Sequence, residues 1–216
     1  WFGKQIFLAA IGILPFVVFY KVAPRVWQRF ATTLYVVNLA LLLAVLVVGT
    51  SAGGATRWLD LKVITFQPSE LSKVALALTL GAFYANRLEY VRRPSTFVLS
   101  ILHLLPPLLL VFKQPHLGGT LTLVAVWIGI SIVAGVPWRF IGFALLLGAV
   151  LGVIAWNVPG ILTPEQKSRV MSFINPDTRG DGYQQTRALV ALGSGGVFGV
   201  GYLHGQLKAN GSVPKQ

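Results

Sequence analysis

The sequence predicts an all-α integral membrane protein, a polytopic helical bundle. Of its 216 residues, 55% are hydrophobic and only 11% are charged, and the mean hydropathy is +0.71. About a quarter of the residues of an ordinary soluble domain are charged, so a lipid bilayer is the better solvent for this chain. Six long apolar runs, separated by short polar segments, indicate several membrane crossings.

Each apolar run is long enough to span a membrane as a helix, which takes roughly 17 to 25 mainly apolar residues. We expect spans over about 6–22, 32–50, 69–86, 97–112, 117–135 and 139–158. Five prolines, at 24, 68, 94, 137 and 159, lie at or near the ends of these runs, where a helix tolerates or is stopped by proline. Pro106 and Pro107 lie inside the fourth run and should kink it. Residues 1–158 are therefore predicted to form one transmembrane bundle.

The segment 159–216 contains no run long enough to span a membrane. Val170, Phe173 and Ile174 are spaced to share one helical face, which is typical of a helix at the membrane surface. The glycine-rich stretch GSGGVFGVGYLHG lacks the Gly-Lys-Ser/Thr ending of a phosphate-binding loop. We expect 159–216 to be a large loop outside the membrane, partly an interfacial helix.

The net charge of +12 could indicate nucleic acid or anionic lipid as a partner. The cations sit mostly between apolar runs, so membrane lipids are expected and nucleic acid is not. Loops 21–31, 87–96 and 136–139 hold seven Lys and Arg residues, against four in the opposite short segments. The positive-inside rule therefore places these three loops in the cytoplasm and 159–216 outside.

Cysteine is absent, which excludes thiol catalysis, disulfides and Cys-ligated metals. The three histidines, His103, His116 and His204, show no metal-ligand spacing. We expect no organic cofactor. His103, inside the fourth run, is interpreted as a buried polar group rather than a catalytic one.

Glu70 and Lys73 begin the third run, three residues apart, and so share a helical face. Pro68 suits a first helical turn, where the helix dipole favours an anion such as Glu70. The pair either only neutralises itself or supports a polar cavity between helices. A carboxylate held by a lysine is a poor general base, so we interpret the pair as support for a site.

Two further groups of residues lie at the predicted outer rim. Arg57 and Trp58 are either interfacial anchors or ligands for a phosphate and for a sugar or apolar surface. Lys113, Gln114 and His116 form either a polar cluster with a function or part of a tight turn.

Five stretches, in this order, resemble the SEDS family (shape, elongation, division, sporulation), the bacterial membrane enzymes typified by RodA and FtsW. They are RWLDL at 57–61, FQPSELSK at 66–73, QPHLGGT at 114–120, RVMSFINP at 169–176 and GYQQTRALVALGSGGVFGVGYLHGQ at 182–206. GVGYLHGQL is more similar to the RodA branch. The chain departs from the family where His116 replaces its usual aspartate.

The resemblance implies a fold of ten membrane helices in the complete family member. This chain would cover helices two to seven and the following large extracytoplasmic loop, truncated before the catalytic motif. The family's catalytic aspartate, in a His-Thr-Asp-Phe motif, is expected just beyond Gln216, so no catalytic residue is expected in this chain.

The implied function is a RodA-type peptidoglycan glycosyltransferase for cell elongation and shape, in the bacterial cytoplasmic membrane. It would polymerise lipid II, a polyprenyl-diphosphate-linked disaccharide-pentapeptide, on the outer face, beside a class B penicillin-binding protein. A divalent cation, Mg²⁺ or Mn²⁺, would be compatible with the diphosphate. The expected substrate-binding residues are Arg57, Trp58, Lys113, Gln114, Arg169, Tyr183, Gln184, Arg187 and Ser194.

Two alternatives remain open. A flippase for the lipid-linked precursor would need polar residues that continue to mid-membrane, whereas these spans are polar mostly at their outer ends. A non-catalytic scaffold for the penicillin-binding protein would also contain the same membrane helices.

The orientation is testable by labelling, because the chain has no native cysteine. We expect a cysteine introduced as Trp58→Cys or within 159–216 to react with a membrane-impermeant maleimide on intact cells. A Ser95→Cys control, in the 87–96 loop, should stay unlabelled. Labelling of Ser95→Cys alone would reverse the predicted orientation.

Overall fold

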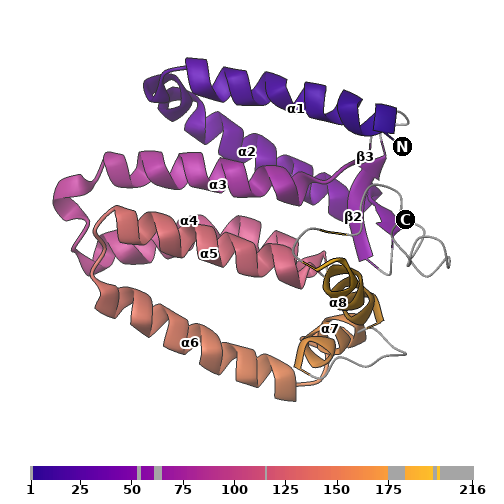
Figure 1. The fold of residues 1–216 in the computed structure, drawn as a ribbon. Helices are drawn as coiled ribbons and strands as arrows, with labels where there is room; N and C mark the ends of the chain where they lie inside the picture. The colour runs from indigo at the N-terminus through magenta and orange to yellow at the C-terminus, as the bar shows by residue number, and fades with distance from the viewer. Residues whose placement is uncertain are drawn as a thin grey trace. The chain divides into compact units, whose positions relative to one another are not determined.

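The computed structural model describes residues 2–52, 55–60, 65–114, 116–174, 183–196 and 199. They divide into two compact units, Trp1–Val150 and Leu151–Gln216. The helices of the first unit are α1 (Phe2–Lys21), α2 (Pro24–Val48), α3 (Pro68–Ala85), α4 (Pro94–Lys113), α5 (Leu117–Val133) and the larger part of α6 (Trp138–Asn157) (Figure 1). The helical class predicted from the sequence is confirmed.

Every apolar run coincides with a helix, and within the described residues four helices are long and apolar enough to cross a membrane: α2, α4, α5 and α6. The helix α3 has 18 residues, but Glu70 and Lys73 in its first two turns lower its hydropathy. The helix α2 begins at Pro24, before the predicted start at 32, because its first turns carry polar residues that end the apolar run without ending the helix.

Prolines begin three of these helices, since Pro24, Pro68 and Pro94 each occupy the first turn. Proline fits there because the first amide has no partner inside the helix.

The C-terminal end of α5 is closed by a glycine turn, in which Gly135 adopts φ 87° and the Val136 amide donates to the Ser131 carbonyl at 3.0 Å. This is the Schellman ending, which needs a left-handed residue that glycine supplies at least cost.

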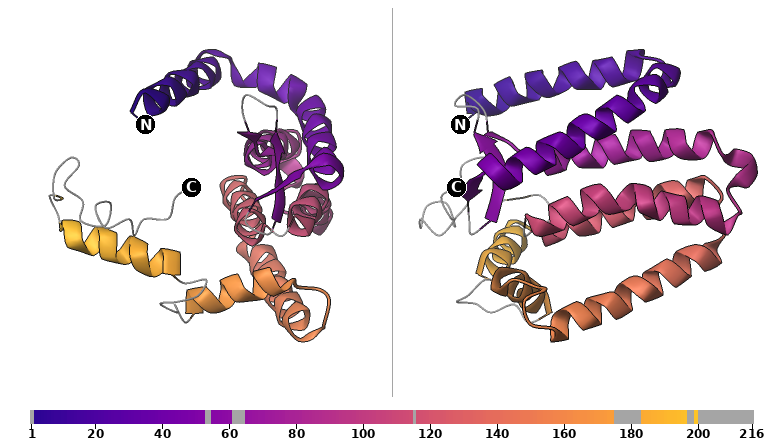
Figure 2. Two further views of the ribbon diagram at one scale, coloured as in Figure 1. Left: turned by 90° about the vertical axis from the view of Figure 1, so that its right-hand side faces the viewer. Right: turned by 180° about the vertical axis from the view of Figure 1, so that it is seen from behind.

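Three short strands follow α2, where the sequence predicted only a loop. They are β1 (Thr50–Ala52), β2 (Ala55–Asp60) and β3 (Thr65–Phe66), paired antiparallel in the order β1-β2-β3. Trp58 pairs with Thr50 across the sheet. Figure 2 (left) looks along the helices from the end that carries these strands.

The helix α3 lies at the centre of the packing and contacts α2, α4 and α5. Leu42, Leu76, Leu80 and Leu123 are buried between these helices at 0–1% exposure. Much of the outer surface is apolar and exposed, as lipid-facing helices require.

Polar side chains inside the bundle hydrogen-bond between helices. The Tyr84 and Ser131 hydroxyls lie 2.9 Å apart, and the Trp127 indole donates to the Ser100 hydroxyl at 3.1 Å. Both pairs are buried, so neither member can be satisfied by water. These contacts fix the rotation of α3 and α4 against α5.

The second unit contains the end of α6, α7 (Pro164–Ile174) and α8 (Tyr183–Gly195). Thr163 caps α7, because its hydroxyl accepts from the Gln166 amide at 3.3 Å while the Gln166 side chain accepts from the Thr163 amide at 2.9 Å. This reciprocal capping box starts the helix that Val170, Phe173 and Ile174 predicted. Its position at a membrane surface stays a prediction.

The family departure at His116 has a structural explanation. His116 precedes α5, and its Nδ1 accepts a hydrogen bond from the Gly119 amide at 3.2 Å, as an N-cap side chain does. A Cβ at Gly119 would lie 2.8 Å from the His116 ring, so glycine permits this approach. Aspartate is a preferred residue for this role, and the imidazole nitrogen takes its place here.

We expect His116→Ala to destabilise the full-length protein by about 0.5–2 kcal/mol, the usual cost of removing an N-cap acceptor. His116→Asp should preserve stability, since a carboxylate both caps α5 and favours its dipole. Thermal unfolding in detergent measures both variants. Equal unfolding temperatures for wild type and His116→Ala would show that the cap contributes nothing.

Candidate functional site

The predicted residues of the first unit gather at the end that carries the strands. The start of α3, the end of α4, the start of α5 and strand β2 meet there (Figure 1). The chain topology therefore brings Trp58, Glu70, Lys73 and Lys113 to one end of the bundle, although they are far apart in sequence.

The ion pair predicted from the spacing of Glu70 and Lys73 is present. The Lys73 Nζ donates to the Glu70 Oε2 at 2.7 Å, one turn along α3. The Glu70 side chain is 57% exposed and that of Lys73 29% exposed. The pair thus lies at the protein surface, where it adds little net stability, and it offers a neutralised rather than a free carboxylate.

Behind the ion pair lies a buried polar contact that the sequence analysis did not include. The Ser72 hydroxyl is within 2.9 Å of Asn38 Oδ1 and 3.0 Å of the Pro68 carbonyl. The neighbouring Ser69 hydroxyl is buried and has no hydrogen-bond partner among the described residues. The sequence does contain a sign of this contact, because Asn38 is a lone amide in the middle of an apolar run and such a side chain needs a hydrogen-bond partner when buried.

Gln114 ends α4 with its side chain 1% exposed, and its Nε2 donates to the Leu42 carbonyl at 3.1 Å. The side chain thereby joins α4 to α2, a structural contact in addition to its predicted role in substrate binding. Lys113 is exposed beside it, and Trp58 is half-buried. These two are accessible to a ligand at this end.

Five predicted residues belong to the second unit. Arg169 lies on α7, and Tyr183, Gln184, Arg187 and Ser194 lie on α8, where Ser194 is exposed. The side chains of the other four, and that of Arg57 on β2, lie outside the described residues. Their expected contacts with substrate stay predictions.

The described residues do not provide a metal site. They contain no group of three His, Asp or Glu side chains placed to hold an ion. Glu70, at the strand-bearing end, is already bound to Lys73. A single neutralised carboxylate does not fit the oxygen-rich coordination that Mg²⁺ or Mn²⁺ needs.

Comparison with known proteins identifies the family. The FtsW/RodA/SpoVE family model, described as "Cell cycle protein", matches residues 1–216. The peptidoglycan glycosyltransferase MrdB of Escherichia coli K12 is 35% identical over 204 residues, which are 94% of this chain and 54% of that protein. The probable peptidoglycan glycosyltransferase FtsW of Thiomicrospira cyclica is 35% identical, covering 93% of this chain and 52% of that protein.

Solved structures agree with this result. A chain of a peptidoglycan synthase complex that coordinates polymerization and crosslinking superposes with a TM-score of 0.69 at 34% identity, covering 90% of this chain and 57% of that one. The Thermus thermophilus rod shape determining protein RodA superposes with a TM-score of 0.56 at 34% identity, covering 66% of this chain and 47% of that one. The chain has about the same sequence identity to FtsW relatives as to RodA relatives, so sequence identity does not assign it to either branch.

The chain spans about half the length of the curated relatives that it matches. The match to the family model covers every residue, and the helices have the expected membrane-spanning character. The chain is therefore an integral membrane protein that belongs to the FtsW/RodA/SpoVE family of cell cycle proteins.

Proposed function

We propose that this chain is the membrane core of a peptidoglycan glycosyltransferase that polymerises lipid II on the outer face of the bacterial cytoplasmic membrane. The observation that carries the proposal is its similarity, over more than nine-tenths of its length, to proteins named peptidoglycan glycosyltransferases. The synthase complex that it resembles supports a class B penicillin-binding protein as partner.

The reaction would join a sugar hydroxyl to the anomeric carbon of the lipid-linked donor. The bond between that carbon and the diphosphate oxygen breaks, a base takes the hydroxyl proton, and the diphosphate leaves with the bonding electrons. Such a step needs a base and positive charge near the leaving group. We assign the base to the family aspartate expected beyond Gln216.

The cations proposed to neutralise the diphosphate are Arg57, Lys113, Arg169 and Arg187. Trp58 would line the cavity, and Tyr183, Gln184 and Ser194 would contact the sugars or peptide. Since the described residues hold no metal cluster, any Mg²⁺ or Mn²⁺ would be bound largely by the diphosphate itself, as is common for Mg²⁺.

The packing favours this enzyme over a flippase. The polar groups in the middle of the helices bond to one another, as Thr79 does to His103. On α3, between the ion pair and Thr79, the Leu76 side chain is only 1% exposed. Leu42 of α2 is fully buried. Within the described first unit, the polar groups in the middle of the helices are therefore engaged with each other, which favours chemistry at the outer face over transport through the bundle.

The activity is tested with purified full-length protein, its transpeptidase partner and lipid II. We expect a glycan ladder from wild type, a fall of about 100-fold or more when the aspartate beyond Gln216 is replaced by alanine, and a clear loss with Trp58→Ala. Trp138→Ala, an exposed tryptophan at the other end of the bundle, is the matched control. Equal ladders from all variants would refute the site, and no ladder from wild type would favour a scaffold or flippase.

The ion pair is tested separately. We expect Glu70→Leu with Lys73→Leu to reduce polymerisation several-fold while unfolding shifts by no more than about 1 kcal/mol, because exposed pairs contribute little to stability. Exchanging the two residues, Glu70→Lys with Lys73→Glu, keeps a pair and should restore part of the activity. An unchanged ladder from the double leucine variant would show that the pair supports no site.

A further inference from the structure

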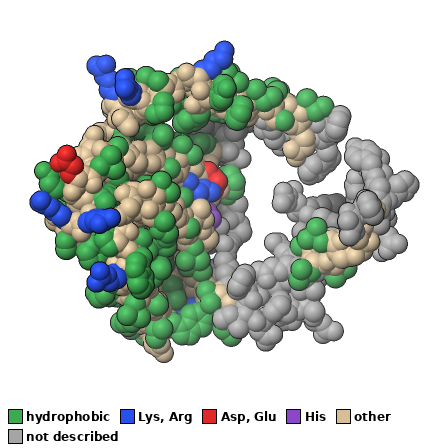
Figure 3. All heavy atoms as spheres, turned by 60° about the vertical axis from the view of Figure 1, so that its left-hand side comes forward, with side chains coloured by type: hydrophobic (Ala, Val, Ile, Leu, Met, Phe, Trp, Pro, Cys, Tyr) green, Lys and Arg blue, Asp and Glu red, His purple; other side chains and the backbone are tan. Residues whose placement is uncertain are grey.

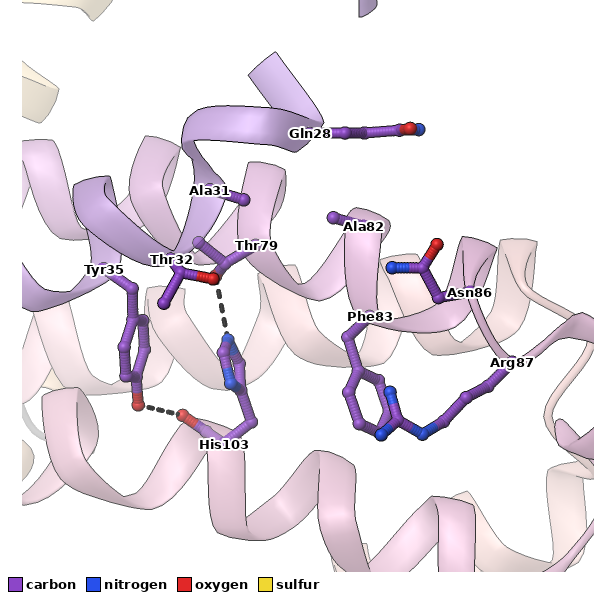
Figure 4. A pocket seen from close by; sticks show the side chains of 10 residues that line it. All are labelled: Gln28, Ala31, Thr32, Tyr35, Thr79, Ala82, Phe83, Asn86, Arg87 and His103. Atoms are coloured by element: carbon purple, nitrogen blue, oxygen red, sulfur yellow. Dashed lines mark hydrogen bonds between the residues drawn. The ribbon is translucent and has the colours of Figure 1, made fainter. Parts of the chain in front are cut away.

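A pocket lies at the opposite end of the first unit, far along the helices from the proposed site. It has a volume of about 350 Å³ and is formed by the start of α2, the end of α3 and the first half of α4. Figure 4 shows the side chains that line it. This volume is at the lower end of the range of about 300–1,000 Å³ for ligand pockets, which suits a small polar group.

The floor of the pocket is held by two hydrogen bonds, one of which compensates for a proline in α4. Pro107 has no amide hydrogen, so the His103 carbonyl, four residues earlier, has no helical partner. The Tyr35 hydroxyl donates to this carbonyl at 2.6 Å, and the Thr79 hydroxyl lies 2.8 Å from His103 Nε2 (Figure 4). The polar groups of the floor are therefore positioned before any ligand binds.

The rim of the pocket carries a cation and two amides. Arg87 lies over the Phe83 ring, with its guanidinium carbon 4.4 Å from the ring centroid. No acidic side chain pairs with Arg87 in the part of the chain that the structure describes. Its planar N–H groups suit a phosphate. The exposed Asn86 side chain offers donors on the same side of the pocket, and Gln28 lies farther along the rim (Figure 4).

The surroundings favour an anion with apolar tails. The helix ends and loops at this end carry the cations Lys21, Arg25, Arg29, Arg87, Arg92, Arg93 and Arg139, against the single acid Glu89. Figure 3 shows Lys and Arg side chains around this end on a largely hydrophobic surface. Val36 and Leu99, one turn from Thr32 and His103 of the wall, are 59% and 44% exposed and offer apolar surface for acyl chains.

We propose that this pocket binds the headgroup of an anionic phospholipid of the adjacent leaflet, with Arg87 on its phosphate. Basic pockets between membrane helices are known to take such headgroups. A bound lipid would join α2, α3 and α4 at the end opposite the proposed active site. The site is separate from the lipid II site and does not depend on the proposed activity.

The test uses native mass spectrometry of the full-length protein in an uncharged detergent, with phosphatidylglycerol or phosphatidylcholine of matched acyl chains. Wild type should retain phosphatidylglycerol preferentially. Arg87→Gln should weaken retention about tenfold, the effect of losing one charge-assisted hydrogen bond, and Arg87→Lys should restore part of it. Arg92→Gln, with the same charge change in the same loop, should behave as wild type.

A second variant guards against misfolding of Arg87→Gln. Asn86→Glu places an anion at an exposed position of the rim, with the same net charge change, and should also weaken retention. If Arg87→Gln, Asn86→Glu and Arg92→Gln all lost the same amount of bound phosphatidylglycerol, the binding would depend only on the overall surface charge. That result would overturn the site. Equal retention of both lipids, or displacement of phosphatidylglycerol by excess inorganic phosphate, would overturn the assignment to a lipid headgroup.

Discussion

The structure depends on one constraint, the need to satisfy every polar group inside the protein when the surrounding solvent is lipid. Helices satisfy the backbone, and paired side chains satisfy the interior, as Tyr84 and Ser131 do. The same need explains how α4 accommodates Pro107, one of its two internal prolines, since Tyr35 donates to the carbonyl that Pro107 leaves without a partner. A hydroxyl from α2 thus replaces a hydrogen bond that the helix cannot make itself.

This constraint also decides how the helix ends are built. The end of α5 is satisfied by the turn through Gly135, and its start by the imidazole of His116. Gln114 uses its amide to hold the Leu42 carbonyl of α2. Polar side chains at these helix ends therefore hydrogen-bond backbone groups, and those hydrogen bonds compete with any contact to a substrate.

The sequence predicted the class, the helices and the Glu70–Lys73 contact, because hydropathy and a three-residue spacing depend only on local pattern. It missed the strands around Trp58, since short β segments in a loop leave no apolar run. It also missed the Asn38–Ser72 contact and the pocket around Arg87, because those depend on how separate helices face each other. Gln114 was assigned from its position in the chain, and only packing reveals its contact with α2.

On the proposed function, the two units have different tasks. The described polar end of the first unit supplies a neutralised pair, an exposed lysine and a half-buried tryptophan, a set that can position a diphosphate-linked sugar. Among the described side chains of this end, the Glu70 carboxylate is neutralised by Lys73 and is therefore a poor base for the acceptor hydroxyl. In the proposed enzyme the base would then come from the full-length protein beyond Gln216, and two of the four proposed cations, Arg169 and Arg187, from the segment after α6. The hydrogen bonds between its helices hold the first unit in one arrangement, which suits a part that binds the lipid-linked donor while the base acts from elsewhere in the full-length protein.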